Sequence, residues 1–160
     1  MGKEPKFVTV RKPPAHPASL LLLGTDFRLL TIIEQHFNEI IPEVEPIKAT
    51  SEEQVLTYLN DCRGNEWRLP RMILLDSLRS QREETWRMLQ YIKELPAPTN
   101  QVPVLLLGDG NDPAEVGEAY DRGVSSYLVK PDSEREWSAC VQLIREYWWE
   151  TVSLPCASSY

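Results

Sequence analysis

Cysteine and histidine are scarce in this sequence, and their spacing excludes two classes of site. The three cysteines, Cys62, Cys140 and Cys156, are an odd number at wide spacing, which fits neither a disulfide framework nor a metal-binding CxxC pair. The two histidines, His16 and His36, lie far from each other and from every cysteine, so no zinc site is expected. The cysteine pattern predicts a reducing, cytoplasmic location.

Positive charge and long apolar runs are also scarce. Acidic side chains number 24 against 17 basic ones, and the resulting formal charge of −7 argues against nucleic acid as a partner. No stretch approaches the roughly 18 consecutive apolar residues of a membrane-spanning helix, so no membrane partner is expected. The leucine run at 20–23 is too short for the apolar region of a signal peptide.

The sequence does contain enough chain and apolar content for one domain. Its 160 residues are 42% hydrophobic, which suits a single packed core, and we expect this domain at residues 18–152. Residues 1–17 hold four basic side chains, one acidic side chain and four prolines, a composition that predicts a flexible tail or a basic docking arm. Residues 153–160 are expected to form a short C-terminal tail.

Five short apolar runs alternate with helical patterns along the domain. The runs predict strands at residues 20–23, 44–48, 72–75, 104–107 and 126–129. Helices are predicted after Asp26, after Thr50 or Ser51, near 83–93, from Pro113 to Gly123, and from Ser133 onward. This alternation predicts an α/β fold, a doubly wound five-stranded parallel sheet with helices on both faces.

Chemistry is expected at the carboxyl ends of these strands, where ligands of such sheets bind. Asp76 follows the third predicted strand and Lys130 follows the fifth. A carboxylate can accept a phosphoryl group as an acyl phosphate, and an ammonium can neutralise the phosphoryl oxygens. The alternative is a buried structural ion pair between the same two residues.

These strands resemble those of response-regulator receiver domains, the chemotaxis-type phosphoacceptor domains of two-component signalling. The matching runs are Leu20-Leu21-Leu22-Leu23, Met72-Ile73-Leu74-Leu75-Asp76 and Ser126-Tyr127-Leu128-Val129-Lys130-Pro131. Residues 92–93, 101–104, 147–149 and 154–155 add a similarity to single-domain regulators that pair with phytochrome-type histidine kinases. The resemblance implies a flavodoxin-like (βα)5 fold, Asp76 as phosphoacceptor, Lys130 as phosphate-binding residue and Mg²⁺ as cofactor.

The sequence departs from this family at the metal site. Family members carry two adjacent acidic residues after the first strand, and the corresponding positions here are Gly24 and Thr25. The resemblance leaves three candidate ligands for Mg²⁺: the carboxylates of Asp76 and Asp26 and the backbone carbonyl of Leu78. Asp26 has a second interpretation as the N-cap of the following helix. Because Mg²⁺ requires near-octahedral oxygen ligands, weak binding is expected.

The second departure concerns the family's conformational switch. A Ser or Thr follows the fourth strand in the family and hydrogen-bonds the bound phosphoryl group, whereas this chain has Gly108. Tyr127 stands at the aromatic switch position, although it fits equally an ordinary aromatic residue at a strand end. Without a hydroxyl at position 108, phosphorylation is not expected to move Tyr127 in the family's way.

The last helix has more apolar residues than one sheet face can cover. Its inward stripe is Trp137, Val141, Ile144 and Trp148. Tyr147, Trp149 and Val152 extend the apolar surface around the helix and predict a homodimer interface. The alternative is that the C-terminal tail folds back over this surface.

Together these features predict a non-enzymatic signalling domain. We expect a response regulator that accepts a phosphoryl group on Asp76 from a histidine kinase and signals through protein partners. One alternative is a pseudo-receiver that acts by binding alone, as an interaction or dimerisation module. Another is a flavodoxin-like small-molecule binder, which requires a glycine-rich first loop, and residues 24–27 supply one glycine.

Overall fold

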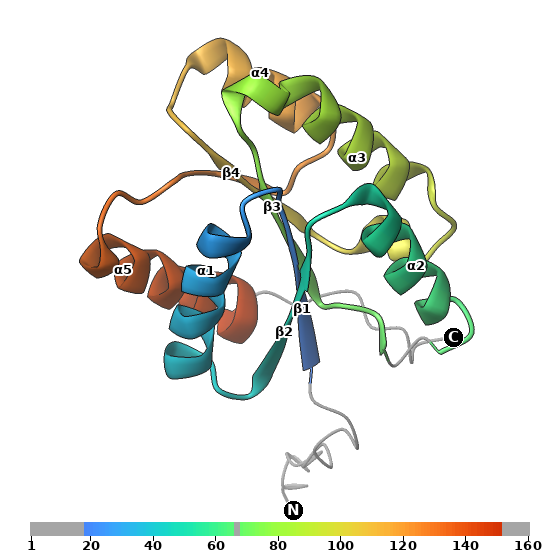
Figure 1. The fold of residues 1–160 in the computed structure, drawn as a ribbon, viewed down its shortest axis with the longest axis horizontal. Helices are drawn as coiled ribbons and strands as arrows, with labels where there is room; N and C mark the ends of the chain where they lie inside the picture. The colour runs from blue at the N-terminus through green and yellow to red at the C-terminus, as the bar shows by residue number, and fades with distance from the viewer. Residues whose placement is uncertain (1–17, 66–67, 152–160) are drawn as a thin grey trace, which may run out of the picture.

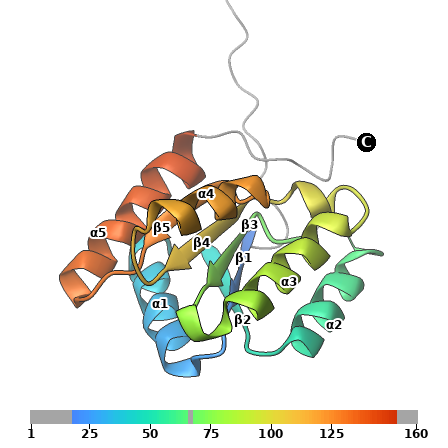
Figure 2. The ribbon, with the colours of Figure 1, turned by 90° about the horizontal axis from the view of Figure 1, so that it is seen from above.

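The structure, a computed structural model, describes residues 18–65 and 68–151. One sheet of five parallel strands forms its centre, in the order β2-β1-β3-β4-β5, and helices cover both faces (Figures 1 and 2). The strands are β1 (Ala18–Leu23), β2 (Val44–Ala49), β3 (Met72–Asp76), β4 (Val104–Gly108) and β5 (Ser126–Val129). The main helices are α1 (Phe27–Ile40), α2 (Glu52–Cys62), α3 (Arg82–Glu94), α4 (Pro113–Asp121) and α5 (Glu134–Ile144). The predicted doubly wound α/β fold is confirmed.

Two apolar layers hold the helices to the sheet. Successive side chains of a strand point to opposite faces, so Leu21 and Leu23 of β1 pack toward α2 and α3, while Leu20 and Leu22 pack toward α1 and α5. All of β3 and β4 is buried, as expected for strands covered on both faces. Burying one leucine side chain stabilises the fold by about 2 kcal/mol. The burial of whole strands therefore holds the ends of β3 and β4 in fixed positions.

Side-chain caps set where four of the helices begin. Asp26 Oδ1 accepts hydrogen bonds from the backbone N–H groups of residues 28 and 29, and Ser51 Oγ accepts from that of residue 54. Asp112 and Ser133 cap α4 and α5 in the same way. Such a cap contributes about 1 kcal/mol to helix stability. At the start of α2, Ser51 is the cap, and Thr50 instead donates its backbone N–H to Gln54 Oε1.

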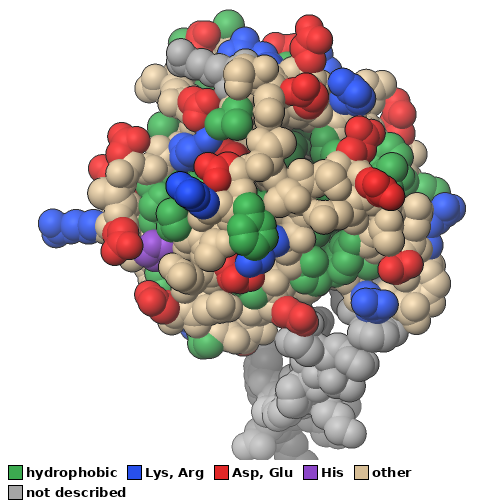
Figure 3. Space-filling model, in the orientation of Figure 1, with side chains coloured by type: hydrophobic (Ala, Val, Ile, Leu, Met, Phe, Trp, Pro, Cys, Tyr) green, Lys and Arg blue, Asp and Glu red, His purple; other side chains and the backbone are tan. Residues whose placement is uncertain are grey.

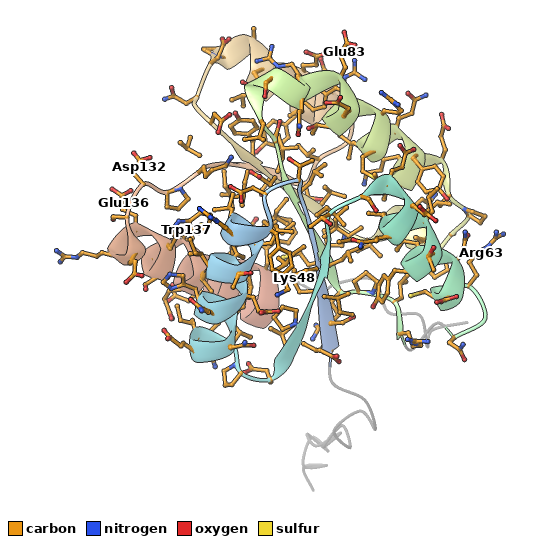
Figure 4. All side chains as sticks on the ribbon, in the orientation of Figure 1. Lys48, Arg63, Glu83, Asp132, Glu136 and Trp137 are labelled. Atoms are coloured by element: carbon orange, nitrogen blue, oxygen red, sulfur yellow. The ribbon has the colours of Figure 1, made fainter. Side chains whose placement is uncertain are left out.

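The last helix packs as predicted on its inner side. Trp137, Val141 and Ile144 are buried against the α1 side of the sheet, and Figure 4 shows Trp137 extending from α5 toward α1. A π-helical segment, η4 (Arg145–Thr151), continues α5. On the outer side Leu143 and Tyr147 are 57% and 54% exposed.

Several predictions fall on parts of the chain that the structure does not describe. The N-terminal tail at 1–17, the C-terminal tail at 153–160, the residue Val152 and the side chain of Trp149 lie outside the described residues. Within the described part, none of the helices is both long and apolar enough to cross a lipid bilayer.

Candidate functional site

The carboxyl ends of β1, β3, β4 and β5 meet at one edge of the sheet. Leu23 pairs with Leu75, Asp76 pairs with Leu107, and the last pair of β4 and β5 is Gly108 with Val129. All of these pairings are parallel, so the residues that follow each strand converge at this edge. The register therefore brings Gly24, Asp76, Gly108 and Lys130 to a single site.

Asp76 and Lys130 form a close ion pair at the centre of this site. Lys130 Nζ lies 2.6 Å from Asp76 Oδ1, and the side chains are 15% and 1% exposed respectively. The other carboxylate oxygen, Asp76 Oδ2, is buried and hydrogen-bonds to none of the described residues. Burial raises the pKa of Asp76, although the hydrogen bond from Lys130 acts to lower it. One carboxylate oxygen is thus paired with the ammonium, and the second has no hydrogen-bond partner among the described residues.

A second carboxylate, which the sequence analysis did not identify, shares the same lysine. Lys130 Nζ lies 2.9 Å from Asp109 Oδ1, and the Asp109 side chain is 32% exposed. Burial acts to lower the pKa of Lys130, but hydrogen bonds and charge from the two aspartates outweigh it and raise that pKa. The sequence signal for Asp109 was the position of an acidic residue directly after the fourth strand, between Gly108 and Gly110.

Two of the predicted metal ligands, Asp26 and the Leu78 carbonyl, make local hydrogen bonds in this structure. The capping interpretation of Asp26 is confirmed, because its Oδ1 accepts from two backbone N–H groups of α1. The Leu78 carbonyl accepts the N–H of Gln81 in a tight turn. Within residues 18–65 and 68–151, no three Asp, Glu, His or Cys side chains converge as ligands for one metal ion. Asp26 therefore serves as the cap of α1, and Mg²⁺ binding by Asp76, Asp26 and the Leu78 carbonyl stays a prediction.

The positions that carry acidic residues in the family serve other purposes here. A Cβ atom at Gly24 would lie 2.9 Å from Asp76 Cβ and 3.3 Å from Leu30 Cδ2, so only glycine fits without a shift. Thr25 Oγ1 donates a hydrogen bond to Gln81 Oε1 at 2.8 Å. This bond links the loop after β1 to the loop after β3. The first loop thus supplies close packing and a neutral hydrogen bond in place of two carboxylates.

Tyr127 lies directly over Gly108. A Cβ atom at position 108 would be 1.9 Å from the Tyr127 hydroxyl oxygen and 2.3 Å from its Cζ atom. The hydroxyl donates a 2.6 Å hydrogen bond to the carbonyl of Gly110, and the Tyr127 backbone N–H donates to the Tyr120 hydroxyl. The aromatic ring therefore fills the space next to residue 108 into which any larger side chain would extend.

A cavity of about 220 Å³ lies away from this site. Its lining comes from the end of α2 and from the segment before β4, and includes Leu59, Cys62, Leu95 and Pro98. These residues belong to the opposite edge of the sheet, where parallel strands begin. The cavity has no part in the chemistry of Asp76.

The site and the fold can be compared with known proteins. No family model matches the chain. Among curated proteins, the chain is 36% identical over 93 residues to the "Probable methanogenesis regulatory protein FilR2" of Methanothrix harundinacea and 33% identical over 88 residues to the response regulator Rcp1 of Synechocystis. These matches cover 58% and 55% of this chain and 59% and 58% of those proteins. The chain thus matches less than two thirds of the length of either relative.

Solved structures extend the comparison to most of the chain. The response regulator RPA3017 in red light signalling of R. palustris has a TM-score of 0.74 at 20% identity, covering 86% of this chain and 98% of its own. The Mn²⁺-bound form of Rcp1 has a TM-score of 0.69 at 25% identity, covering 88% and 100%. The chain therefore has the fold of response-regulator receiver domains, and its relatives and structural neighbours include regulators of this family. The phosphorylated cyanobacterial phytochrome response regulator RcpA shares the fold, with a TM-score of 0.70 at 22% identity and coverage of 88% and 99%.

Proposed function

We propose that this receiver-like domain acts as a response regulator that accepts a phosphoryl group on Asp76 from a phosphohistidine of a histidine kinase. The observation that carries the proposal is the buried Asp76 carboxylate with Lys130 Nζ at 2.6 Å. In the transfer, Asp76 Oδ2 forms a bond to phosphorus while the phosphorus–nitrogen bond of the phosphohistidine breaks. The imidazole nitrogen keeps the electron pair of that bond, and Lys130 neutralises charge on the phosphoryl oxygens.

Phosphotransfer from a small donor tests this proposal directly. The full chain is incubated with acetyl phosphate and a divalent cation, and intact mass reports an added phosphoryl group. We expect one acid-stable, base-labile phosphoryl group on the wild type and none on Asp76→Asn. Asp132→Asn, which removes an exposed carboxylate near the site, is the matched control and should be labelled like the wild type. Absence of label on the wild type, or label that persists in Asp76→Asn, contradicts the proposal.

The identity of the kinase rests on the relatives. RPA3017 belongs to red light signalling and RcpA is a phytochrome response regulator, as their structures are described. We therefore propose a phytochrome-type histidine kinase as the phosphoryl source. The protein acts as a phosphoacceptor in the cytoplasm and is not an enzyme with turnover. On the face shown in Figure 3, acidic and basic side chains are interspersed, which supports a protein partner over nucleic acid.

For the cofactor we propose weak Mg²⁺ binding. A divalent cation is bound in the Mn²⁺ form of Rcp1, but the described residues of this chain offer no converging set of three ligands. Thr25→Asp should strengthen Mg²⁺ binding by about tenfold, because it adds a carboxylate to the loop after β1. Tryptophan fluorescence titrated with Mg²⁺ measures the affinity, and sub-millimolar binding by the wild type contradicts the proposal. Gly24→Asp is unsuitable, since its Cβ would press on Asp76.

A second candidate function is signalling without phosphorylation. It is supported by Gly108, which has no hydroxyl to bond a phosphoryl oxygen, and by the Tyr127 hydroxyl, which donates its hydrogen bond to the Gly110 carbonyl. In that case partners bind the same surface in the presence and absence of phosphotransfer. Beryllofluoride, a phosphoryl mimic, should then leave the NMR signals of Tyr127 and α4 unchanged. Concerted shifts from Asp76 to α4 favour the phosphorylation-dependent function instead.

We further propose a homodimer through the last helix. Leu143 and Tyr147 are more than half exposed on its outer side, and the Tyr147 ring packs edge-on against Trp148 with centroids 5.2 Å apart. Trp149 and Val152 are proposed to extend this surface. Sedimentation equilibrium at micromolar concentration should give a dimer for the wild type and a monomer for Tyr147→Glu. A wild-type monomer contradicts the proposal and favours coverage by the C-terminal tail.

A further inference from the structure

The loop after β4 is tied to β5 through three consecutive residues. The Gly108 carbonyl accepts the backbone N–H of Lys130 at 2.8 Å, Asp109 Oδ1 accepts from Lys130 Nζ at 2.9 Å, and the Gly110 carbonyl accepts the Tyr127 hydroxyl at 2.6 Å. The loop thus holds the phosphate-binding lysine by its backbone and by its side chain.

The two carboxylates on Lys130 differ in their access to solvent. The Asp76 side chain is 1% exposed, that of Lys130 is 15% exposed and that of Asp109 is 32% exposed. The ammonium therefore lies between a buried carboxylate and one at the mouth of the site. A phosphodonor reaches Asp76 from the solvent side, so it encounters the charge of Asp109 beside the lysine that it needs.

We propose that Asp109 is a positioning residue that holds the Lys130 ammonium at the mouth of the site and competes there with an incoming phosphoryl group. This inference rests on the proposed function of Asp76. A phosphoryl group carries a charge of about −1.5 to −2 at neutral pH, and a carboxylate next to the same ammonium repels it and occupies part of its hydrogen-bonding capacity. Asp109 therefore slows phosphorylation and weakens the hold of the site on phosphate.

Two measurements on the full chain test the role of Asp109. The first is the affinity for inorganic phosphate without metal, followed by the NMR signals of the Lys130 side chain. The second is the rate of labelling by acetyl phosphate with a divalent cation. In that reaction Asp76 Oδ2 bonds to phosphorus, the bond from phosphorus to the bridging oxygen breaks, and acetate leaves with the electron pair.

We expect Asp109→Asn to bind phosphate about tenfold more tightly than the wild type and to be labelled faster by a similar factor. Asp109→Glu restores the charge and should behave like the wild type. Asp132→Asn removes an exposed charge elsewhere near the site and should also leave phosphate affinity unchanged. A purely structural role for Asp109 would lower stability in Asp109→Asn without increasing phosphate affinity.

The outcomes separate this inference from the proposed function. Equal phosphate affinity of the wild type and Asp109→Asn overturns the inference, whether or not Asp76 is labelled. Tighter phosphate binding by Asp109→Asn with no label on Asp76 in either protein supports the role of Asp109 and overturns the proposed phosphotransfer. Failure of Asp109→Glu to restore the wild-type affinity also overturns the inference, because the effect then does not follow the charge.

Discussion

Because Gly108 and Tyr127 are in close contact, adding one methyl group at position 108 is expected to lower the stability of the chain. Gly108→Ala places a Cβ atom 1.9 Å from the Tyr127 hydroxyl oxygen, so the ring has to leave its position. Gly108 has no positive φ angle, and the substitution therefore tests this steric contact and not backbone strain. The displaced ring also loses its hydrogen bond to the Gly110 carbonyl.

The expected loss of stability follows from these contacts. Turning the ring outward exposes roughly 60 Å² of apolar surface, which costs about 1.5 kcal/mol at ~25 cal/mol per Å². The lost hydrogen bond adds about 1 kcal/mol. Replacing glycine restricts the unfolded chain and returns about 0.5 kcal/mol. Gly108→Ala should therefore lower the free energy of unfolding by about 2 kcal/mol.

Urea denaturation with a matched control tests this value. Gly117 in α4 has no atom within 4 Å of its hypothetical Cβ, so Gly117→Ala should instead stabilise the chain by about 0.5–1 kcal/mol through helix propensity. In a Tyr127→Ala background, Gly108→Ala should cost little, because the colliding ring is gone. An unchanged urea midpoint for Gly108→Ala refutes the reasoning. So does a loss of about 2 kcal/mol in the free energy of unfolding that persists in the Tyr127→Ala background.

Three further predictions concern buried or half-buried titratable groups, each measured by urea denaturation. Asp76→Asn should raise the free energy of unfolding at pH 7, because burial raises the pKa of this carboxyl and disfavours its charged form in the folded chain. This gain should vanish as the pH falls below about 4, where the carboxyl is protonated in both the folded and the unfolded chain. Burial raises the pKa of Tyr58 to about 12, so stability should fall as the pH rises from about 10 to about 12, and Tyr58→Phe should lack this step. Arg82→Ala should cost about 3 kcal/mol because it leaves the Glu115 carboxylate, 1% exposed, without its partner, whereas Glu115→Gln should cost less because the Arg82 side chain is 38% exposed.

The fold was predictable because its signals are local. Each buried strand is a continuous apolar run, and the predicted bounds agree with β3, β4 and β5 to within one residue. The end of α2 was less accurate, since residues 60–62 belong to the helix and not to the following loop. Asn60 and Asp61 carry no apolar signal, whereas Cys62 continues the apolar spacing of Val55 and Leu59 and is buried in the core.

The site was predictable only where strand position decides it. Asp76 and Lys130 each follow a strand, and parallel pairing then brings them together, as the 2.6 Å contact shows. Asp109 lies in a Gly-Asp-Gly run, which has a local preference for a turn and carries no sign of a contact with Lys130. Its contact with Lys130 depends on how the loop after β4 lies against β5, which is tertiary information. The buried Glu115 is a similar case, since its partner Arg82 comes from another helix.

The two glycines that depart from the family pattern share a physical cause. Gly24 lets the end of β1 lie close to Asp76, since a Cβ atom at position 24 would be only 2.9 Å from Asp76 Cβ. Gly108 likewise leaves room for the ring of Tyr127. Neither glycine marks an empty position, because the neighbouring side chain occupies the space. Introducing one family residue therefore does not produce the family site: a side chain at 24 presses on Asp76, and one at 108 displaces the ring of Tyr127. Reversal requires paired changes, such as Gly108→Thr with a smaller residue at 127, and their stabilities should be strongly non-additive.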